Sequence, residues 1–489
     1  MQPGRSWILL DMTLRTPLAL AVLAAGLTLT GCDVVDNVNP RQSVTPEQAL
    51  ETVEGFEALL ASAYDDLQDQ TYYGQQFMLV PDALADNLRV PNETSNRYPD
   101  FSVNSIGSGL TRWGPHYDTI NEVNTVLSQI DDLEVEASNP QAIRDRIKGE
   151  AFFLRAINYF DLARAKGYEP GREVNGFDLA VIIRTEPTET VEDADFRARS
   201  TNREVYDLVV SDLQQAITLL DGTARGSKNF ASVAAAQALL ARVQLYQSNW
   251  AAAEAAATAA LAQSSASLVD ASADESALVA AFTGTTNPES IFEVILTPST
   301  DGNVTGVNAS LQSLTDPTRG GFFDAVPTDD LVAAHEEGDA RLALYSQATV
   351  AGETLPYIRK YVGAVAQDVD PVPVFRVSEM LLILAEARAE QGNTAGALEA
   401  LNTLRNARGL GDSDAASAGE IVDAVLAERR VELAFEGHRF FDLKRRGLDI
   451  PKPQLGSVIA YTNFRLLAQL PQTEVDNNPQ LVQNPGYSD

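Results

Sequence analysis

The sequence predicts a mostly α-helical protein, built of helical hairpins with long loop-rich insertions and a few short strands. Apolar residues recur at helical spacing in three stretches, at about 113–166, 202–263 and 374–446. Two other regions, at about 71–112 and 270–372, lose this periodicity and are expected to be loop-rich insertions. Within the second insertion, residues 290–295 have the apolar composition of a short strand.

The N-terminus has the pattern of an export signal. Arg15 precedes an apolar run from Leu18 to Leu29, which has signal-peptide length and is too short for a comfortable transmembrane helix. The run ends in Leu29-Thr30-Gly31-Cys32, which matches a lipobox, and this cysteine is the only one in the chain. We therefore expect a signal peptide at 1–31, lipidation of Cys32, and a flexible polar tether at 32–44.

A single folded domain is expected from residue 45 to residue 489. Thr45 and Pro46 are suited to the N-cap and first position of its first helix. A second helix is expected from Arg112, and a third from about Gln141 to Lys166. The remaining helices are expected at about 202–220, 229–248, 250–263, 374–391, 394–408 and 419–446.

Part of the helical pattern occurs twice. Leu240-Ala241, Gln247, Asn249 and Ala253 are matched, 144 positions later, by Leu384-Ala385, Gln391, Asn393 and Ala397. Each copy is a helix, a short polar turn and a second helix with small residues on one face. This is the pattern of a tetratricopeptide (TPR) hairpin, in which alanines let two antiparallel helices approach closely. Two copies so far apart indicate a helical scaffold with insertions, not a regular solenoid.

Charge and motif content exclude several functions. The chain has 489 residues, 45% of them apolar, and a formal net charge of −32. So acidic a chain is not expected to bind nucleic acid or to be held electrostatically on anionic lipid. The histidines His116, His335 and His438 are isolated, and there is no metalloprotease helix, nucleophile elbow or phosphate-binding loop. We expect neither an enzyme nor a cofactor or metal site.

A series of motifs runs along the chain in a fixed order. Its members are Trp113-x3-Tyr117-x2-Ile120-x3-Asn124, Gly149-Glu-Ala-Phe-Phe-Leu-Arg-Ala156, Arg376 to Ala387, Leu401 to Leu410, Glu428 to Gly447, and Gln469-Leu470-Pro471 with Glu474 and Asn478-Pro479. Behind a lipobox, this series resembles that of the SusD/RagB family. Glu428 to Gly447, which combines an apolar stripe with many charges of both signs, is its most specific member.

The resemblance implies a SusD-like fold and a lipoprotein on the outer face of the outer membrane. Such a protein is expected to bind oligosaccharides and to deliver them, as a lid, to a SusC-like TonB-dependent transporter. A peptide-binding member of the same family and a TPR-type envelope scaffold without a transport role are the alternatives. The long aromatic insertions favour ligand binding, because a pure scaffold would not need them.

The candidate ligand site lies in these insertions. Aromatic rings stack on the apolar faces of sugars, while amides, guanidinium groups and carboxylates bind their hydroxyls. The candidate residues are Tyr72, Tyr73, Asn87, Arg89, Asn92, Asn96, Arg97 and Tyr98 in the first insertion, and Phe322 and Phe323 in the second. Neither insertion contains a tryptophan, which argues against a flat stacking platform and leaves peptides open as ligands.

The charged motif residues are expected to have a structural role. We expect them to form buried ion pairs inside the scaffold and not to contact ligand. They are Glu150, Arg155, Arg376, Glu379, Glu386, Glu432, Glu436 and Arg439. Glu428 to Gly447 is accordingly expected to be a helix buried on several sides, with ion pairs that fix its position.

Overall fold

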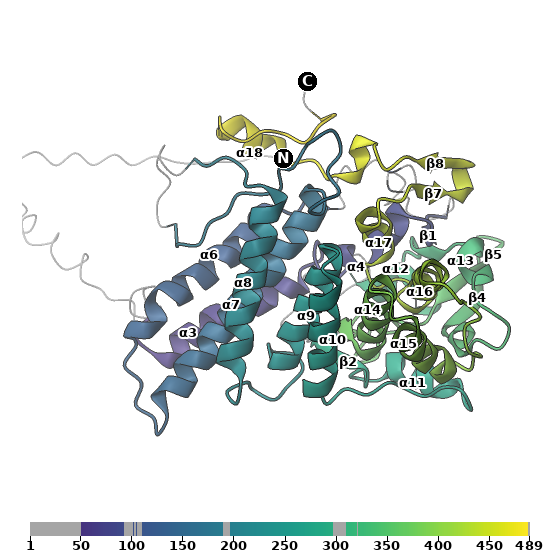
Figure 1. Cartoon of the computed structure of the whole chain (residues 1–489), viewed down its shortest axis with the longest axis horizontal. Coiled ribbons are helices and arrows are strands. Elements are labelled where there is room, and N and C mark those ends of the chain that lie inside the picture. Colours follow the sequence, from purple (N-terminus) through teal and green to yellow (C-terminus); the bar gives the residue numbers. More distant parts are fainter. Residues whose placement is uncertain are drawn as a thin grey trace, which may run out of the picture. The chain divides into compact units, whose positions relative to one another are not determined.

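A row of helices, in which successive members pack side by side, forms the scaffold of the computed structural model (Figure 1). The structure describes residues 50–91, 101, 104, 110–188, 196–296, 310–319 and 321–487. The row begins with α6 (Gly114–Gln129) and α7 (Pro140–Lys166), continues through α8 (Asn202–Leu220), α9 (Val233–Tyr246) and α10 (Trp250–Gln263), and ends with α14 (Val377–Glu390), α15 (Thr394–Ala407) and α16 (Ala418–Glu432). The predicted mostly helical fold is confirmed.

Shorter elements surround this row. The helices are α3 (Val53–Asp65), α4 (Gln76–Leu84), α11 (Ser276–Thr283), α12 (Leu311–Thr315), α13 (Asp329–Ala333), α17 (Arg439–Arg445) and α18 (Gln472–Asn477). The strands form antiparallel pairs: β1 (Leu88–Arg89) with β3 (Val326–Pro327), β2 (Ser290–Val294) with β6 (Val372–Arg376), β4 (Tyr345–Val350) with β5 (Glu353–Ile358), and β7 (Ile450–Lys452) with β8 (Ser457–Ile459). The strand expected at 290–295 is therefore present as β2.

Two helix predictions are corrected. Helix α4 lies within the expected first insertion; Phe77 to Leu84 are all buried, so the segment has no polar face to give it an amphipathic period. The expected helix at 419–446 is two helices, because the chain turns between α16 and α17. At that turn Phe435 and Gly437 have φ values of 63° and 78°, and a Cβ on Gly437 would lie 2.2 Å from the Phe77 carbonyl oxygen. Only glycine fits there.

The repeated hairpins have the same turn and pack against each other. In the first, the Asn249 N–H donates to the Gln244 carbonyl at 2.9 Å; in the second, the Asn393 N–H donates to the Arg388 carbonyl at 2.8 Å. Helix α10 of the first copy packs on α14 of the second, although the second insertion separates them in sequence. The side chain of Arg388 crosses this interface to Glu254 at 2.8 Å.

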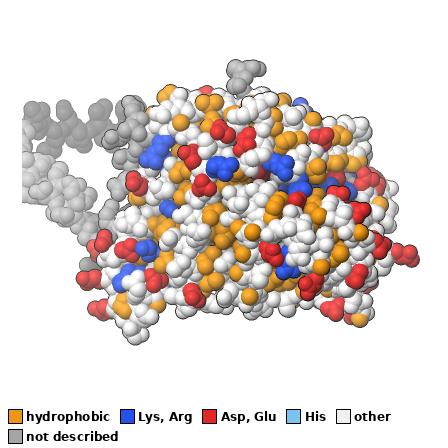
Figure 2. Space-filling view, in the orientation of Figure 1, with side chains coloured by type: hydrophobic (Ala, Val, Ile, Leu, Met, Phe, Trp, Pro, Cys, Tyr) orange, Lys and Arg blue, Asp and Glu red, His pale blue; other side chains and the backbone are white. Residues whose placement is uncertain are grey.

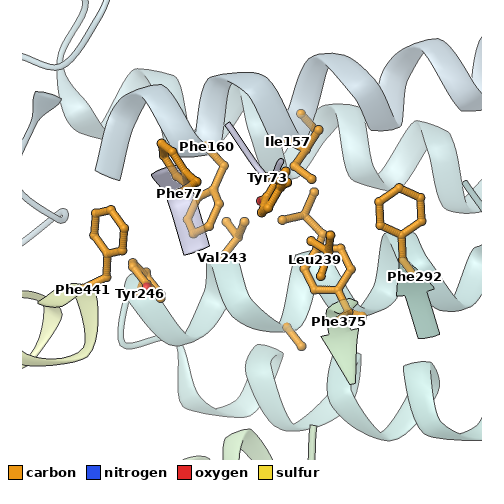
Figure 3. Close-up of a cluster of buried hydrophobic side chains, with 14 of the residues drawn as sticks. Tyr73, Phe77, Ile157, Phe160, Leu239, Val243, Tyr246, Phe292, Phe375 and Phe441 are labelled. Atoms are coloured by element: carbon orange, nitrogen blue, oxygen red, sulfur yellow. The ribbon is translucent and has the colours of Figure 1, made fainter. Parts of the chain in front are cut away.

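Acidic side chains are spread over the face of the molecule in Figure 2, in keeping with the net charge. Beneath the surface, the aromatic core lies along α7 and α9 (Figure 3). Phe77, Phe160 and Phe441 surround the guanidinium group of Arg164, with ring centroids 5.0, 5.3 and 4.3 Å from its central carbon. Over the described residues, no helix is both long and apolar enough to span a bilayer.

The expected buried ion pairs are present. Arg155 pairs with Asp212, Glu379 with Arg242, Glu386 with Arg445, Arg439 with Asp86, and Glu150 with Arg146 and Arg225. The largest group, the Arg376 network, is built around Arg376, Arg408, Glu289, Glu432 and Glu436, and Arg341 and Lys360 join it at Glu432 and Glu436. Arg376 lies 2.6, 3.0 and 2.8 Å from Glu289, Glu432 and Glu436, and Arg408 lies 2.8 and 2.9 Å from Glu289 and Glu432.

Glu432 is shared by three buried arginines, because Arg341 lies 3.3 Å from it in addition to Arg376 and Arg408. Burial alone would raise the pKa of Glu432, but the charges of Arg408 and Arg376 hold this pKa well below its usual range. The carboxylate therefore stays ionised, and each guanidinium group depends on it for a buried counter-charge.

We predict that Glu432→Gln lowers the free energy of unfolding by about 3–5 kcal/mol, because it leaves three buried arginines short of a partner. Asp423→Asn, on an exposed position of the same helix, is the control and should change stability by less than about 0.5 kcal/mol. Chemical denaturation of both variants measures the difference. Equal unfolding midpoints would contradict a structural role for the network.

Candidate functional site

The two insertions meet at a small antiparallel sheet. Strand β1, from the first insertion, pairs with β3 from the second, so that Leu88 faces Pro327 and Arg89 faces Val326. The hydroxyl of Thr328 extends this contact by donating to the Asp86 carbonyl at 2.8 Å. Strand β3 also packs against β5 of the neighbouring hairpin. Segments far apart in sequence are thereby fixed beside each other.

The C-terminal motif holds the base of this junction. The Arg439 guanidinium group donates two hydrogen bonds to the Asp86 carboxylate, at 2.7 and 3.0 Å, and Arg430 lies 3.2 Å from the same carboxylate. Burial alone would raise the pKa of Asp86, but the hydrogen bond and charge of Arg439 and the charge of Arg430 lower it. Asp86 is thus an ionised anchor between α4 and β1.

Tyr72 and Tyr73 do not form the expected stacking surface. Their exposed fractions are 0% and 3%, and both hydroxyls donate to one Asp161 oxygen at 2.7 Å. Burial and the Asp161 charge raise the pKa of both phenols well above the usual value, so they remain donors. The prediction that these rings contact ligand is wrong in this structure, because α7 covers them and uses their polar atoms.

Asn87 and Phe323 are also structural. The Asn87 side chain is completely buried, donates to Asp82 at 2.8 Å and accepts from Arg430 at 3.0 Å, so both ends of its amide are bonded inside the protein. Phe323 is 2% exposed and packs with Val326 and Leu355 in a small apolar cluster. Neither side chain is placed to meet a ligand.

Arg89 and Phe322 are the two predicted residues, among those that the structure describes, whose side chains stay partly exposed. The Arg89 side chain is 26% exposed, and its guanidinium group lies 3.4 Å from Glu353 of β5. Its Nε makes no hydrogen bond within the described part of the chain. Phe322 is half-buried. Asn92, Asn96, Arg97 and Tyr98, which follow β1 in the sequence, lie outside the described residues, as do the signal segment, the tether and Cys32.

Sequence reasoning missed the contribution of β5. Glu353 and the half-buried Tyr357 reach the junction from this strand, and no motif marks either residue. Strand β5 also lacks the regular alternation of exposed and buried residues that is typical of a hairpin, so no local pattern marks it. The contact of β5 with β3 joins two segments that are not adjacent in the sequence, and such a contact leaves no local pattern.

Comparisons with known proteins agree with this architecture. A family model described as "SusD family" matches residues 345–487, and one described as "Starch-binding associating with outer membrane" matches residues 41–245. SusD-like protein P38 of Formosa agariphila is 26% identical, over 96% of this chain and 98% of that protein.

Solved structures share the fold. A SusD superfamily protein from Bacteroides vulgatus has a TM-score of 0.78 at 26% identity, covering 90% of this chain and 100% of that chain. A SusD superfamily protein from Bacteroides thetaiotaomicron also has a TM-score of 0.78, at 24% identity, covering 89% and 100%. The fold is therefore that of the SusD superfamily. Since the two family models match separate parts of one continuous chain, the chain belongs to the SusD/RagB family.

We predict that Asp86→Asn lowers the free energy of unfolding by about 3 kcal/mol at neutral pH, because two arginines lose their shared anion. A carboxyl whose pKa is lowered by folding stabilises the protein above its unfolded pKa, and this contribution is lost as the pH falls through the folded pKa. The difference between wild type and variant should therefore shrink below about pH 4. Denaturant unfolding at pH 7 and pH 3 measures it.

The control is Asp131→Asn, which removes an exposed partner of Lys148. It should cost less than about 1 kcal/mol at either pH. If Asp86→Asn costs no more than this control, Asp86 does not anchor the junction.

Proposed function

We propose that this protein is a cell-surface lipoprotein of the outer membrane that binds oligosaccharides and delivers them to a SusC-like TonB-dependent transporter. Family membership and the starch-binding, outer-membrane description of the matching family model support carbohydrate binding at that membrane. The lipobox at Cys32 supports lipid anchoring, and the motif series supports a transporter partner.

One structural observation carries the proposed location of the site, namely the pairing of β1 with β3. It brings Arg89 of the first insertion opposite Val326 of the second, a few residues along the chain from Phe322. Loops fixed on a rigid scaffold are the usual place for a binding site. The proposed ligand contacts are Arg89 and Phe322, together with Asn92, Asn96, Arg97 and Tyr98. Tyr72, Tyr73, Asn87 and Phe323 support the loops from inside.

We predict that the double variant Arg89→Ala with Phe322→Ala weakens glycan binding about tenfold, because it removes a charged donor and an aromatic surface. Thermal stability should change little, since both side chains are partly exposed. A glycan and peptide array followed by calorimetry on the glycan that is retained measures the change.

Tyr73→Phe is the control for this pair. It removes a buried hydrogen bond to Asp161, so it should lower stability and leave glycan affinity unchanged. Undiminished glycan retention by the Arg89 and Phe322 variant would refute the proposed location. Retention of peptides and of no glycan would favour the peptide-binding alternative.

We predict that Cys32→Ser moves the protein from the membrane fraction to the soluble fraction, because serine cannot be thioether-linked to lipid. Thr28→Ser, which leaves the lipobox intact, is the control and should stay with the membrane. Fractionation and immunoblotting of intact cells measure both. Membrane residence of Cys32→Ser would contradict lipid anchoring at this position.

A further inference from the structure

A cleft lies where the two ends of the motif series meet. The start of α6, the extended segment 182–188, Phe196 and α18 enclose a cavity of about 370 Å³. Trp113 and Tyr117 line it from the first motif, and Glu474 lines it from the last. Among the residues that the structure describes, none that lines this cleft belongs to either insertion, and neither Arg89 nor Phe322 reaches it.

The wall of this cleft is held rigidly by side chains. Segment 182–188 is extended, and every second residue of it is hydrogen-bonded through its backbone to a helix side chain. Tyr117 bonds both the N–H and the carbonyl of Ile182, and Tyr159 bonds both of these groups of Arg184. Asn124 donates to the carbonyls of Arg184 and Glu186, and Asn121 bonds the N–H and carbonyl of Thr188. The cleft is therefore formed before any ligand arrives.

The polar side chains of the cleft that are not used to hold its wall indicate the chemistry of a ligand. The amides of Asn121 and Asn124 are consumed by the wall, whereas the side chains of Asp118, Glu474 and Asn477 make no hydrogen bond or ion pair to any described residue. All three are exposed at the cleft. Two of them are carboxylates, which accept hydrogen bonds and donate none.

Aromatic side chains supply the other half of a recognition surface. Tyr117 and Phe196, both half-buried, supply the aromatic surface of the cavity, whereas Trp113 is 4% exposed and packs against Tyr117 with their ring centroids 5.0 Å apart. A ligand that suits this cleft has apolar faces to lie against rings and hydroxyl groups to donate to carboxylates. Among the described lining residues Arg184 alone is cationic, and it already donates to Thr188, so the two carboxylates dominate the charge of the described lining.

We infer that this cleft is a second carbohydrate site, which takes a short stretch of a neutral glycan and rejects acidic glycans. The inference rests on the proposed function and adds a separate contact and a substrate class to it. Uronate groups would bring negative charge beside Asp118 and Glu474, in a protein that already carries a net charge of −32. A neutral glycan that is bound at both sites at once would dissociate more slowly than a glycan that is bound at one site alone.

Tryptophan makes the cleft directly observable. The chain has three tryptophans, Trp7, Trp113 and Trp250, and of the two that the structure describes only Trp113 lines the cleft. After cleavage of the expected signal peptide, which contains Trp7, the protein labelled with 5-fluorotryptophan carries Trp113 and Trp250, and Trp250→Phe assigns the two fluorine resonances. Maltoheptaose, cellohexaose, mannohexaose and xylohexaose are the neutral probes, and trigalacturonate is the acidic probe.

We expect at least one neutral probe to shift the Trp113 resonance and to leave that of Trp250 in place, and trigalacturonate to shift neither. Asp118→Asn with Glu474→Gln should weaken the binding reported by Trp113 about tenfold, because charged hydrogen-bond acceptors are lost. Asp207→Asn with Glu136→Gln, on exposed positions elsewhere, is the matched control and should have no effect. Arg89→Ala with Phe322→Ala should leave the Trp113 response intact.

Three results would overturn the inference. The first is that no neutral probe shifts the Trp113 resonance. The second is that trigalacturonate shifts it as much as a neutral probe does. The third is that the Arg89 and Phe322 variant loses the Trp113 response, which would show a single site. Failure of the proposed function is distinguishable, because calorimetry would then detect no glycan binding at all. Glycan binding by calorimetry without a Trp113 response would retain the proposed function and reject the second site.

Discussion

The Arg376 network is the interaction on which the rest of the structure depends. Glu289 precedes β2, Arg376 joins β6 to α14, Arg408 ends α15, and Glu432 ends α16. One group of buried charges therefore fixes where the second insertion leaves and rejoins the helical scaffold. Taking these ions out of water is costly, and the cost is offset only when every charge keeps its partners. A shifted register would leave a charge unpaired, so the network selects a single arrangement.

Buried ion pairs also fix the base of the candidate ligand site. Arg430 and Arg439 come from the motif that also supplies Glu432 and Glu436, and they hold Asp86 at the end of α4. The motif from Glu428 to Gly447 thus links the scaffold to the base of the candidate site without contacting ligand itself. Its density of charges of both signs follows from this double task, since a helix that only filled the core would need none of them.

The parts that the sequence predicts are those with a local pattern. Helical periodicity locates α6 to α10, the 144-residue offset identifies the two hairpins, and paired charges of opposite sign mark the buried ion pairs. Tyr72 and Tyr73 were misassigned because an aromatic, amide-rich segment has the same composition whether it faces a ligand or the core. Their burial is decided by Asp161, which is distant in sequence and accepts both hydroxyls. The β1–β3 pairing is likewise a long-range contact without a local signature.

The segment 182–188 shows a constraint that any helical scaffold must meet. An extended segment needs partners for its backbone, but a helix uses its own backbone groups internally and has none to offer. Side chains must take their place, and Tyr117, Asn121, Asn124 and Tyr159 do so from α6 and α7. Tyr117 and Asn124 of the first motif are therefore explained, because their side chains take the place of the backbone groups of a neighbouring strand. Trp113 is accounted for by its place in the buried core. Asp118 and Glu474 have no such structural task, and their meeting at the cleft is what the second carbohydrate site explains.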